Sequence, residues 1–194
     1  NQFFWTADNW SALYDELTNA PVDRVVLGEV VCSKRLPFYQ DRIPEAVATL
    51  VNAGKEVALT SLALITLKRE RKLTAALVEM GVTIELNDLT ALAHLPKGAD
   101  FWVGPLVNVY NEGTLTWLAG LGASRVCLPP ELPLASVETL ASLGADLGVA
   151  IEVWGHGRLP LAISGRCYHA RLHKRTKDNC QFACEDDPDG LEVR

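Results

Sequence analysis

The chain has 194 residues, of which 48% are hydrophobic and 22% are charged. This balance is typical of a globular protein with a substantial core and excludes an intrinsically disordered chain. With 18 Lys and Arg against 24 Asp and Glu, the net charge is −6, which disfavours a nucleic-acid partner because non-specific binding needs a broad basic surface.

Amphipathic stretches alternate with short apolar runs along the chain. Apolar residues at helical spacing predict helices over residues 10–17, 43–51, 73–80 and 133–147. Short β-branched and apolar runs predict strands at 25–31, 56–60, 82–86, 101–103, 125–128 and 150–154, with 3–5 as a further candidate. Glycines that are expected to end helices stand shortly before four of these strands: Gly54, Gly81, Gly122 and Gly148.

Strands that alternate with helices predict an α/β fold with a parallel sheet. Two architectures fit, a doubly wound open sheet and a TIM-barrel-like (β/α) fold, and the lack of a G-x-G-x-x-G motif after the first strand favours the barrel. Because an eight-stranded barrel usually needs about 250 residues, we expect an incomplete barrel over residues 1–165. Residues 166–194 are expected to form a cysteine-bearing extension packed on the same domain.

The chain contains five cysteines, an odd number that argues against a secreted disulfide framework. The first ten residues do not resemble a secretory signal, and the longest apolar run is too short to span a membrane. These features predict a cytoplasmic protein. In a reducing compartment, clustered cysteines indicate metal binding or catalysis.

Three cysteines lie in a polar segment with the spacing Cys167-x12-Cys180-x3-Cys184. Because thiolates are soft ligands, this spacing predicts a zinc or iron–sulfur site, with a disulfide and a spare thiol as the alternative. Cys32 follows an early predicted strand and is the candidate fourth ligand, at the sheet edge where sites collect. Cys127 lies among apolar residues inside a strand and is expected to be a small buried hydrophobe. The lack of a C-x2-C pair favours a cluster over zinc.

Polar residues also follow the ends of several predicted strands. In a barrel such positions face the catalytic mouth, so they are candidate catalytic residues. They are Glu29, Asn108, Asn111 and Glu152. Asn87 and Asp88 share this placement, and Asp88 is equally suited to capping a helix.

Histidines and basic residues surround the late cysteines. We expect His156, His169 and His173 to be solvated loop residues, since four cysteines already complete a site, with ligation of zinc or a cluster by these histidines as the alternative. The basic residues between 166 and 177 fit a solvated loop, with charge compensation for a thiolate-rich cluster or contact with an anionic partner as alternatives.

A family resemblance is carried by the run from Glu152, which reads E-V-W-G-H-G-R-L and continues to S-G-R-C at Cys167. This run resembles the signature of the collagenase-like peptidase family U32. Residues 27–35, L-G-E-V-V-C-S-K-R, together with the C-x12-C-x3-C spacing, resemble the branch of that family that acts in ubiquinone biosynthesis. Peptidase-like members carry a cysteine where this chain has Pro160, seven residues before Cys167.

The resemblance implies that Cys32, Cys167, Cys180 and Cys184 hold a 4Fe–4S cluster. It also implies a heterodimer with a UbiU-like subunit and O2-independent hydroxylation of a ubiquinone precursor, with prephenate as the oxygen source. Family chains continue beyond this length, so it further implies a C-terminally truncated chain. The alternatives are an RNA hydroxylation factor, a U32-type peptidase, and a subunit in which the cysteines bind structural zinc.

Overall fold

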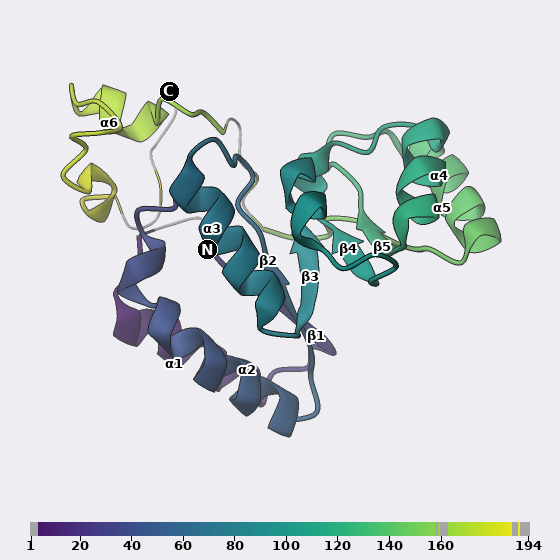
Figure 1. Cartoon of the computed structure of the whole chain (residues 1–194), viewed down its shortest axis with the longest axis horizontal. Coiled ribbons are helices and arrows are strands. Elements are labelled where there is room, and N and C mark those ends of the chain that lie inside the picture. The colour runs from purple at the N-terminus through teal and green to yellow at the C-terminus, as the bar shows by residue number, and fades with distance from the viewer. Residues whose placement is uncertain (1–3, 158, 160–162, 188–189, 191–194) are drawn as a thin grey trace. The chain divides into compact units, whose positions relative to one another are not determined.

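The computed structural model describes residues 4–157, 159, 163–187 and 190 (Figure 1). The chain divides into two compact units. Unit 1 is made of residues 1–57 and 161–194, and unit 2 is made of residues 58–160. The late cysteine-bearing segment therefore belongs to the same unit as the first part of the chain. No helix among the described residues is long and apolar enough to cross a membrane.

The fold is α/β, as predicted, and its described strands follow one another in sequence order within one sheet. The strands are β1 (Arg24–Gly28), β2 (Glu56–Thr60), β3 (Thr83–Leu86), β4 (Phe101–Val103), β5 (Ala123–Cys127) and β6 (Ala150–Glu152). From β2 to β6 every neighbouring pair is parallel. A strand order without a reversal point is that of a (β/α) barrel and not of a doubly wound sheet, so the prediction of an incomplete barrel is confirmed.

The main difference from the predicted strands is at the end of β1. The predicted run continues to residue 31, whereas β1 ends at Gly28. The Glu29 side chain explains this end, because it accepts hydrogen bonds from the backbone N–H groups of Val31 and Cys32 and turns the chain away from the sheet. The candidate strand at 3–5 is not formed at residues 4 and 5, and residue 3 lies outside the described residues.

The helices are α1 (Ala7–Leu17), α2 (Ile43–Asn52), α3 (Lys68–Glu79), α4 (Glu112–Leu121), α5 (Leu134–Leu147) and α6 (Tyr168–Leu172). All four predicted helices are present, and α3 begins five residues before its predicted start at 73. The Gly122 and Gly148 C-caps of α4 and α5 adopt the left-handed conformation, with φ of 111° and 71°. The short helix α6 lies in the segment that the sequence presents as a loop.

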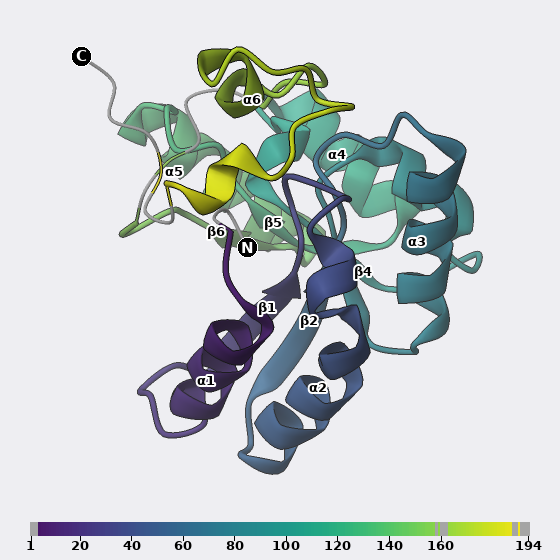
Figure 2. The ribbon, with the colours of Figure 1, turned by 90° about the vertical axis from the view of Figure 1, so that its left-hand side faces the viewer.

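The core of unit 1 lies between β1 and the two helices α1 and α2, which run side by side (Figures 1 and 2). Trp10 and Tyr39 stack there with ring centroids 4.9 Å apart. Leu27 of β1 and Leu50 of α2 are fully buried. This core supports the loop that follows β1, in which Cys32 lies.

The core of unit 2 lies between its parallel strands and the helices α3, α4 and α5. Leu59, Leu86 and Phe101 come from the strands, and Leu118 and Leu140 come from α4 and α5, all of them buried. Helices α4 and α5 pack against each other (Figure 1). The core fixes the strand register and so places the polar side chains at the carboxyl ends of the strands.

Candidate functional site

The four predicted cluster ligands all belong to unit 1. Cys32 follows β1, and Cys167 is the N-cap residue of α6, where its Sγ accepts the Ala170 N–H. Cys180 follows α6, and Cys184 lies in the 3₁₀ turn Ala183–Glu185. All four are free thiols and half-buried. Unit 1 therefore contains the three cysteines of the predicted spacing and the candidate fourth ligand, Cys32.

Electrostatic interactions link these sulfurs. Burial raises the pKa of the Cys184 thiol to about 11, and the neighbouring thiols of Cys32 and Cys167 contribute to this rise. Arg35 acts in the opposite direction, because its positive charge favours the Cys184 thiolate. Cys32 and Cys167 thus both lie within electrostatic range of Cys184, although Cys32 is far from Cys184 in sequence.

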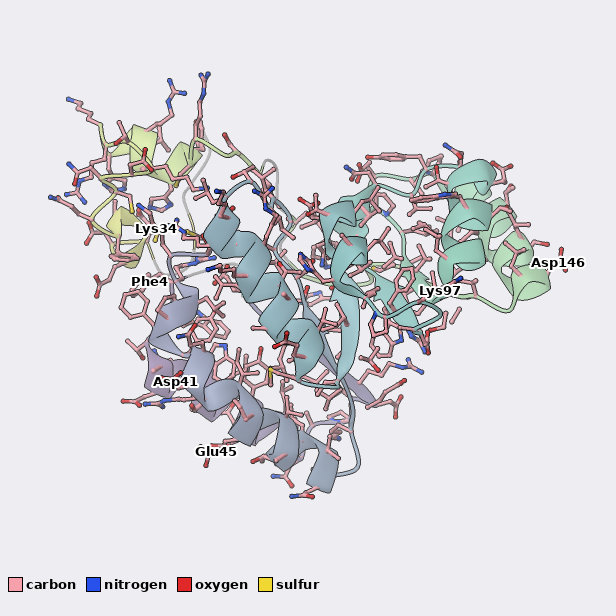
Figure 3. The ribbon with its side chains drawn as sticks, in the orientation of Figure 1. Phe4, Lys34, Asp41, Glu45, Lys97 and Asp146 are labelled. Atoms are coloured by element: carbon pink, nitrogen blue, oxygen red, sulfur yellow. The ribbon has the colours of Figure 1, made fainter. Side chains whose placement is uncertain are left out.

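Lys34 connects the early loop of unit 1 to the late segment. Its ammonium group donates hydrogen bonds to the backbone carbonyls of Lys177 and Asp178, the latter at 3.0 Å (Figure 3). It also lies 4.0 Å from the Cys180 Sγ. The fourth cysteine is therefore held beside the loop that contains Cys32, with a cation next to its sulfur.

Burial raises the pKa of the Cys32 thiol, while Arg35 and Lys177 favour its charged form. The cysteine set thus combines half-buried sulfurs with cations that offset the charge of thiolates. Binding a cationic metal centre would displace the thiol protons and relieve the burial penalty. This donor set fits a metal centre with sulfur ligands.

The distances between the cysteine sulfurs would distinguish a single zinc ion from an iron–sulfur cluster. Four thiolates around one zinc ion, with bonds of about 2.3 Å, place their sulfurs less than about 4 Å apart. Among the described residues, the one group of three metal-ligating atoms within 4.8 Å of one another consists of His169, His173 and Asp187, and the cysteine sulfurs are not gathered so tightly. The choice between zinc and an iron–sulfur cluster at these cysteines therefore stays a prediction.

Glu29 organises the loop that carries Cys32. Its carboxylate, 1% exposed, accepts hydrogen bonds from the backbone N–H groups of Val31 and Cys32, both at 2.9 Å. It also accepts from Arg35 and from the Tyr39 hydroxyl, both at 2.6 Å. Burial raises the pKa of Tyr39, and the charge of Glu29 adds to this rise. The geometry makes Glu29 a residue that orients Cys32.

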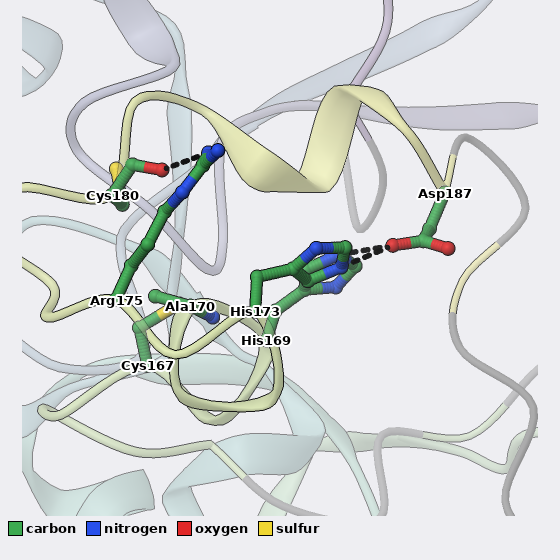
Figure 4. A network of polar contacts seen from close by, with 7 residues as sticks. All are labelled: Cys167, His169, Ala170, His173, Arg175, Cys180 and Asp187. Atoms are coloured by element: carbon green, nitrogen blue, oxygen red, sulfur yellow. Dashed lines mark hydrogen bonds and ion pairs between the residues drawn. The ribbon is translucent and has the colours of Figure 1, made fainter.

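The histidines of the late segment differ from their sequence expectation. His156 is exposed, as expected. His169 and His173 instead lie at the start and end of α6, and both contact the Asp187 carboxylate (Figure 4). Both side chains keep partial solvent exposure, 18% and 31%, but they share a carboxylate partner that the sequence did not indicate. The i, i+4 spacing of the two histidines is the available signal, but it indicates a shared face only within a helix, and α6 is too short to be predicted from the sequence.

A second group of polar residues lies on one face of the unit 2 sheet. Thr60, Glu85, Trp102 and Arg125 are register partners on β2, β3, β4 and β5. Thr60 donates to Glu85 at 3.0 Å, and the Arg125 guanidinium lies 4.9 Å from the Trp102 ring centroid. Burial raises the pKa of Glu85. The sequence interpretation missed this row. Its signal is a single charged residue in each of two otherwise uncharged strands, Glu85 in β3 and Arg125 in β5.

The other predicted catalytic residues belong to unit 2. Glu152 pairs with Arg125 at 2.9 Å. Asn111 is the N-cap of α4, where its side chain accepts the Thr114 N–H, and Asn108 is exposed in a left-handed conformation with φ of 62°. Their catalytic roles, like that of Glu29, stay predictions.

Asn87 and Asp88 also have defined partners in unit 2. Asn87 donates to Glu85 at 2.9 Å, and Asp88 accepts the Thr90 N–H and so caps the turn that follows β3. The Cys127 thiol is half-buried in β5, and burial raises its pKa to about 12. This environment keeps Cys127 a protonated thiol, distinct from the four cysteines of unit 1.

A comparison with protein-family models matches residues 9–187 to Peptidase family U32. The match extends over most of the 194 residues, and it begins before Cys32 and ends after Cys184. This chain belongs to family U32. The matched region of the U32 chain contains the four cysteines, the histidine pair and the polar row of unit 2. A search of the solved structures finds no significant match.

Proposed function

We propose that this U32 chain is the iron–sulfur subunit of an O2-independent hydroxylase of ubiquinone biosynthesis, similar to UbiV. In this proposal it acts with a UbiU-like subunit on a ubiquinone precursor, and prephenate supplies the oxygen atom. One observation carries the proposal. The Cys32 loop and the late segment meet within unit 1, where Lys34 donates hydrogen bonds to the Lys177 and Asp178 carbonyls and lies 4.0 Å from the Cys180 Sγ.

In this proposal Cys32, Cys167, Cys180 and Cys184 hold a 4Fe–4S cluster. A bound cluster of this kind supplies one-electron transfer. The chain's own residues orient and charge-balance the ligands. Glu29 holds the backbone of Cys32, Lys34 lies beside the Cys180 sulfur, and Arg35 favours the thiolate of Cys184.

The contacts around Cys167 do not support the peptidase alternative. A thiol nucleophile needs a base within hydrogen-bond reach. The Cys167 Sγ accepts the Ala170 N–H at 3.5 Å, and the nearby His169 Nε2 contacts Asp187 at 2.6 Å. Among the described residues, no hydrogen bond joins the Cys167 Sγ to a histidine.

The basic residues of the late segment give little support to an RNA substrate. Arg175 donates to the Cys180 carbonyl at 3.1 Å, and Lys177 acts on the Cys32 thiol. Both cations therefore interact with the cysteines or with the backbone beside them. RNA hydroxylation remains an outcome of the test below.

The test is complementation of anaerobically grown bacteria that lack their UbiV-type gene, with ubiquinone measured by mass spectrometry. We expect expression of the full-length wild-type gene to restore ubiquinone. The Cys180→Ser substitution is expected to abolish this rescue. Cys127→Ser is the matched control, because Cys127 lies in β5 of unit 2, and it is expected to rescue fully. Absence of rescue by wild type, with restoration of an RNA hydroxylation instead, would contradict the proposal.

A further inference from the structure

Two imidazole rings and one carboxylate converge in the late segment of unit 1. His169 and His173 lie one helical turn apart at α6, with ring centroids 5.1 Å apart and ring planes within 2° of parallel. Both Nε2 atoms face the same Asp187 oxygen, at 2.6 Å for His169 and 3.0 Å for His173 (Figure 4). The parallel rings therefore present two nitrogens in one direction toward one oxygen.

We propose that His169, His173 and Asp187 form a second metal site, separate from the four cysteines, for a divalent ion of the zinc class. Two imidazoles and one carboxylate are an established ligand combination for zinc, with water in the fourth position. The side chains are 18%, 31% and 26% exposed, so a metal-bound water has access to solvent. The site is distinct from zinc bound by the cysteines.

The geometry needs little adjustment to accept the ion. The three ligand atoms already lie within 4.8 Å of one another. Tetrahedral zinc with bonds of about 2.0–2.1 Å separates neighbouring ligand atoms by about 3.3 Å. The nitrogen–oxygen distances of 2.6 and 3.0 Å must therefore lengthen by about 0.7 and about 0.3 Å, respectively.

The charge of the site also suits a divalent cation. Hydrogen bonds from the two histidines lower the pKa of the Asp187 carboxyl, so the carboxylate is ionised at neutral pH. Imidazole nitrogen and carboxylate oxygen are harder ligands than thiolate, and they suit zinc and cobalt. Iron–sulfur clusters, in contrast, are bound through cysteine sulfur. The two sites are therefore expected to take different metals.

The site has a structural consequence. His169 and Asp187 are 18 residues apart, and Cys180 and Cys184 lie between them. An ion that joins α6 to Asp187 would close this loop and reduce the conformational freedom of the segment that carries two cysteines. Metal binding here would stabilise the cysteine-bearing segment without contacting a cysteine.

The experiment is a Co2+ titration of the full chain, purified anaerobically and reconstituted with iron and sulfide, followed by optical spectroscopy. We expect one equivalent of Co2+ to bind with weak ligand-field bands and without the intense sulfur-to-cobalt charge-transfer band that thiolate ligands give. Asp187→Asn, which keeps the shape and one oxygen of the side chain, is expected to weaken cobalt binding at least about tenfold. His173→Ala is expected to abolish it, and exposed His156→Ala to leave it unchanged.

The readouts separate this proposal from the proposed function. Iron and sulfide content reports on the cysteines, whereas the ligand-field bands report on the histidine pair. Circular dichroism confirms that each variant is folded, and if His173→Ala is not, Asp187→Asn alone decides. Equal cobalt affinity in wild type and Asp187→Asn, or a sulfur-to-cobalt band for all bound cobalt, would overturn the second site.

Discussion

The Glu29 carboxylate is the most heavily hydrogen-bonded acidic group around the cysteines, and its removal has a predictable cost. Its ion pair with Arg35 is buried, with side-chain exposures of 1% and 5%. Removing one member of a buried pair typically costs about 3–5 kcal/mol. We expect Glu29→Ala to lower the free energy of unfolding by about this amount in urea denaturation of the protein without metal.

Glu45 provides the matched control for Glu29, because it is an exposed glutamate on α2 of the same unit (Figure 3). Glu45→Ala is expected to change stability by less than about 0.5 kcal/mol. If the two substitutions had equal effects, the Glu29 network would contribute nothing specific to the loop that carries Cys32.

Glu85 gives stability a pH dependence of defined sign. Burial raises its pKa, so the folded protein retains this proton to higher pH than the unfolded chain does. The stabilisation is complete below the unfolded pKa of about 4.3 and is lost as the pH rises through the folded value. We expect Glu85→Gln to be more stable than wild type at neutral pH and to lose this advantage in acid, as measured by urea denaturation at several pH values.

The control for this pH series is Glu138→Gln, at an exposed position on α5 of the same unit. It should follow the wild-type stability at every pH. A stability difference between Glu85→Gln and wild type that stays constant from acid to neutral pH would contradict a raised pKa at Glu85.

At the scale of elements, the ends of α4 and α5 allow a comparison of two glycines. Both have positive φ, but a Cβ at Gly122 would lie 2.7 Å from the Ala99 carbonyl oxygen, whereas a Cβ at Gly148 would meet nothing within 4 Å. The left-handed conformation alone costs an alanine about 1–2 kcal/mol. We expect Gly148→Ala to cost that amount in thermal or urea unfolding and Gly122→Ala to cost clearly more. Equal costs of the two substitutions would mean that the Ala99 carbonyl can move aside to accommodate the added methyl group.

The elements that could be predicted from the sequence are those with a long or repeated signal. Helix α5 has 14 residues and ends at a glycine, and the strands recur between such helices, so both were found. Helix α6 has five residues, fewer than two turns, so apolar periodicity cannot reveal it. The end of β1 was missed because it depends on hydrogen bonds of the Glu29 side chain with the following backbone.

At the scale of the whole molecule, the sequence predicted which cysteines to consider but not what surrounds them. The spacing of Cys167, Cys180 and Cys184 is local and readable. The contact of Lys34 with Cys180 joins positions 146 residues apart, and the row of polar residues in unit 2 depends on strand register. Such contacts arise from tertiary packing, which single-sequence patterns do not encode.

We propose that the cysteines of unit 1 bind a 4Fe–4S cluster, and the iron and acid-labile sulfide content of the anaerobically purified protein tests this directly. We predict about four irons and four sulfides per chain with a brown charge-transfer absorption. These should be lost in Cys180→Ser and kept in Cys127→Ser. Stoichiometric zinc without sulfide, or a Cys180→Ser variant that retains all its iron, would contradict the claim.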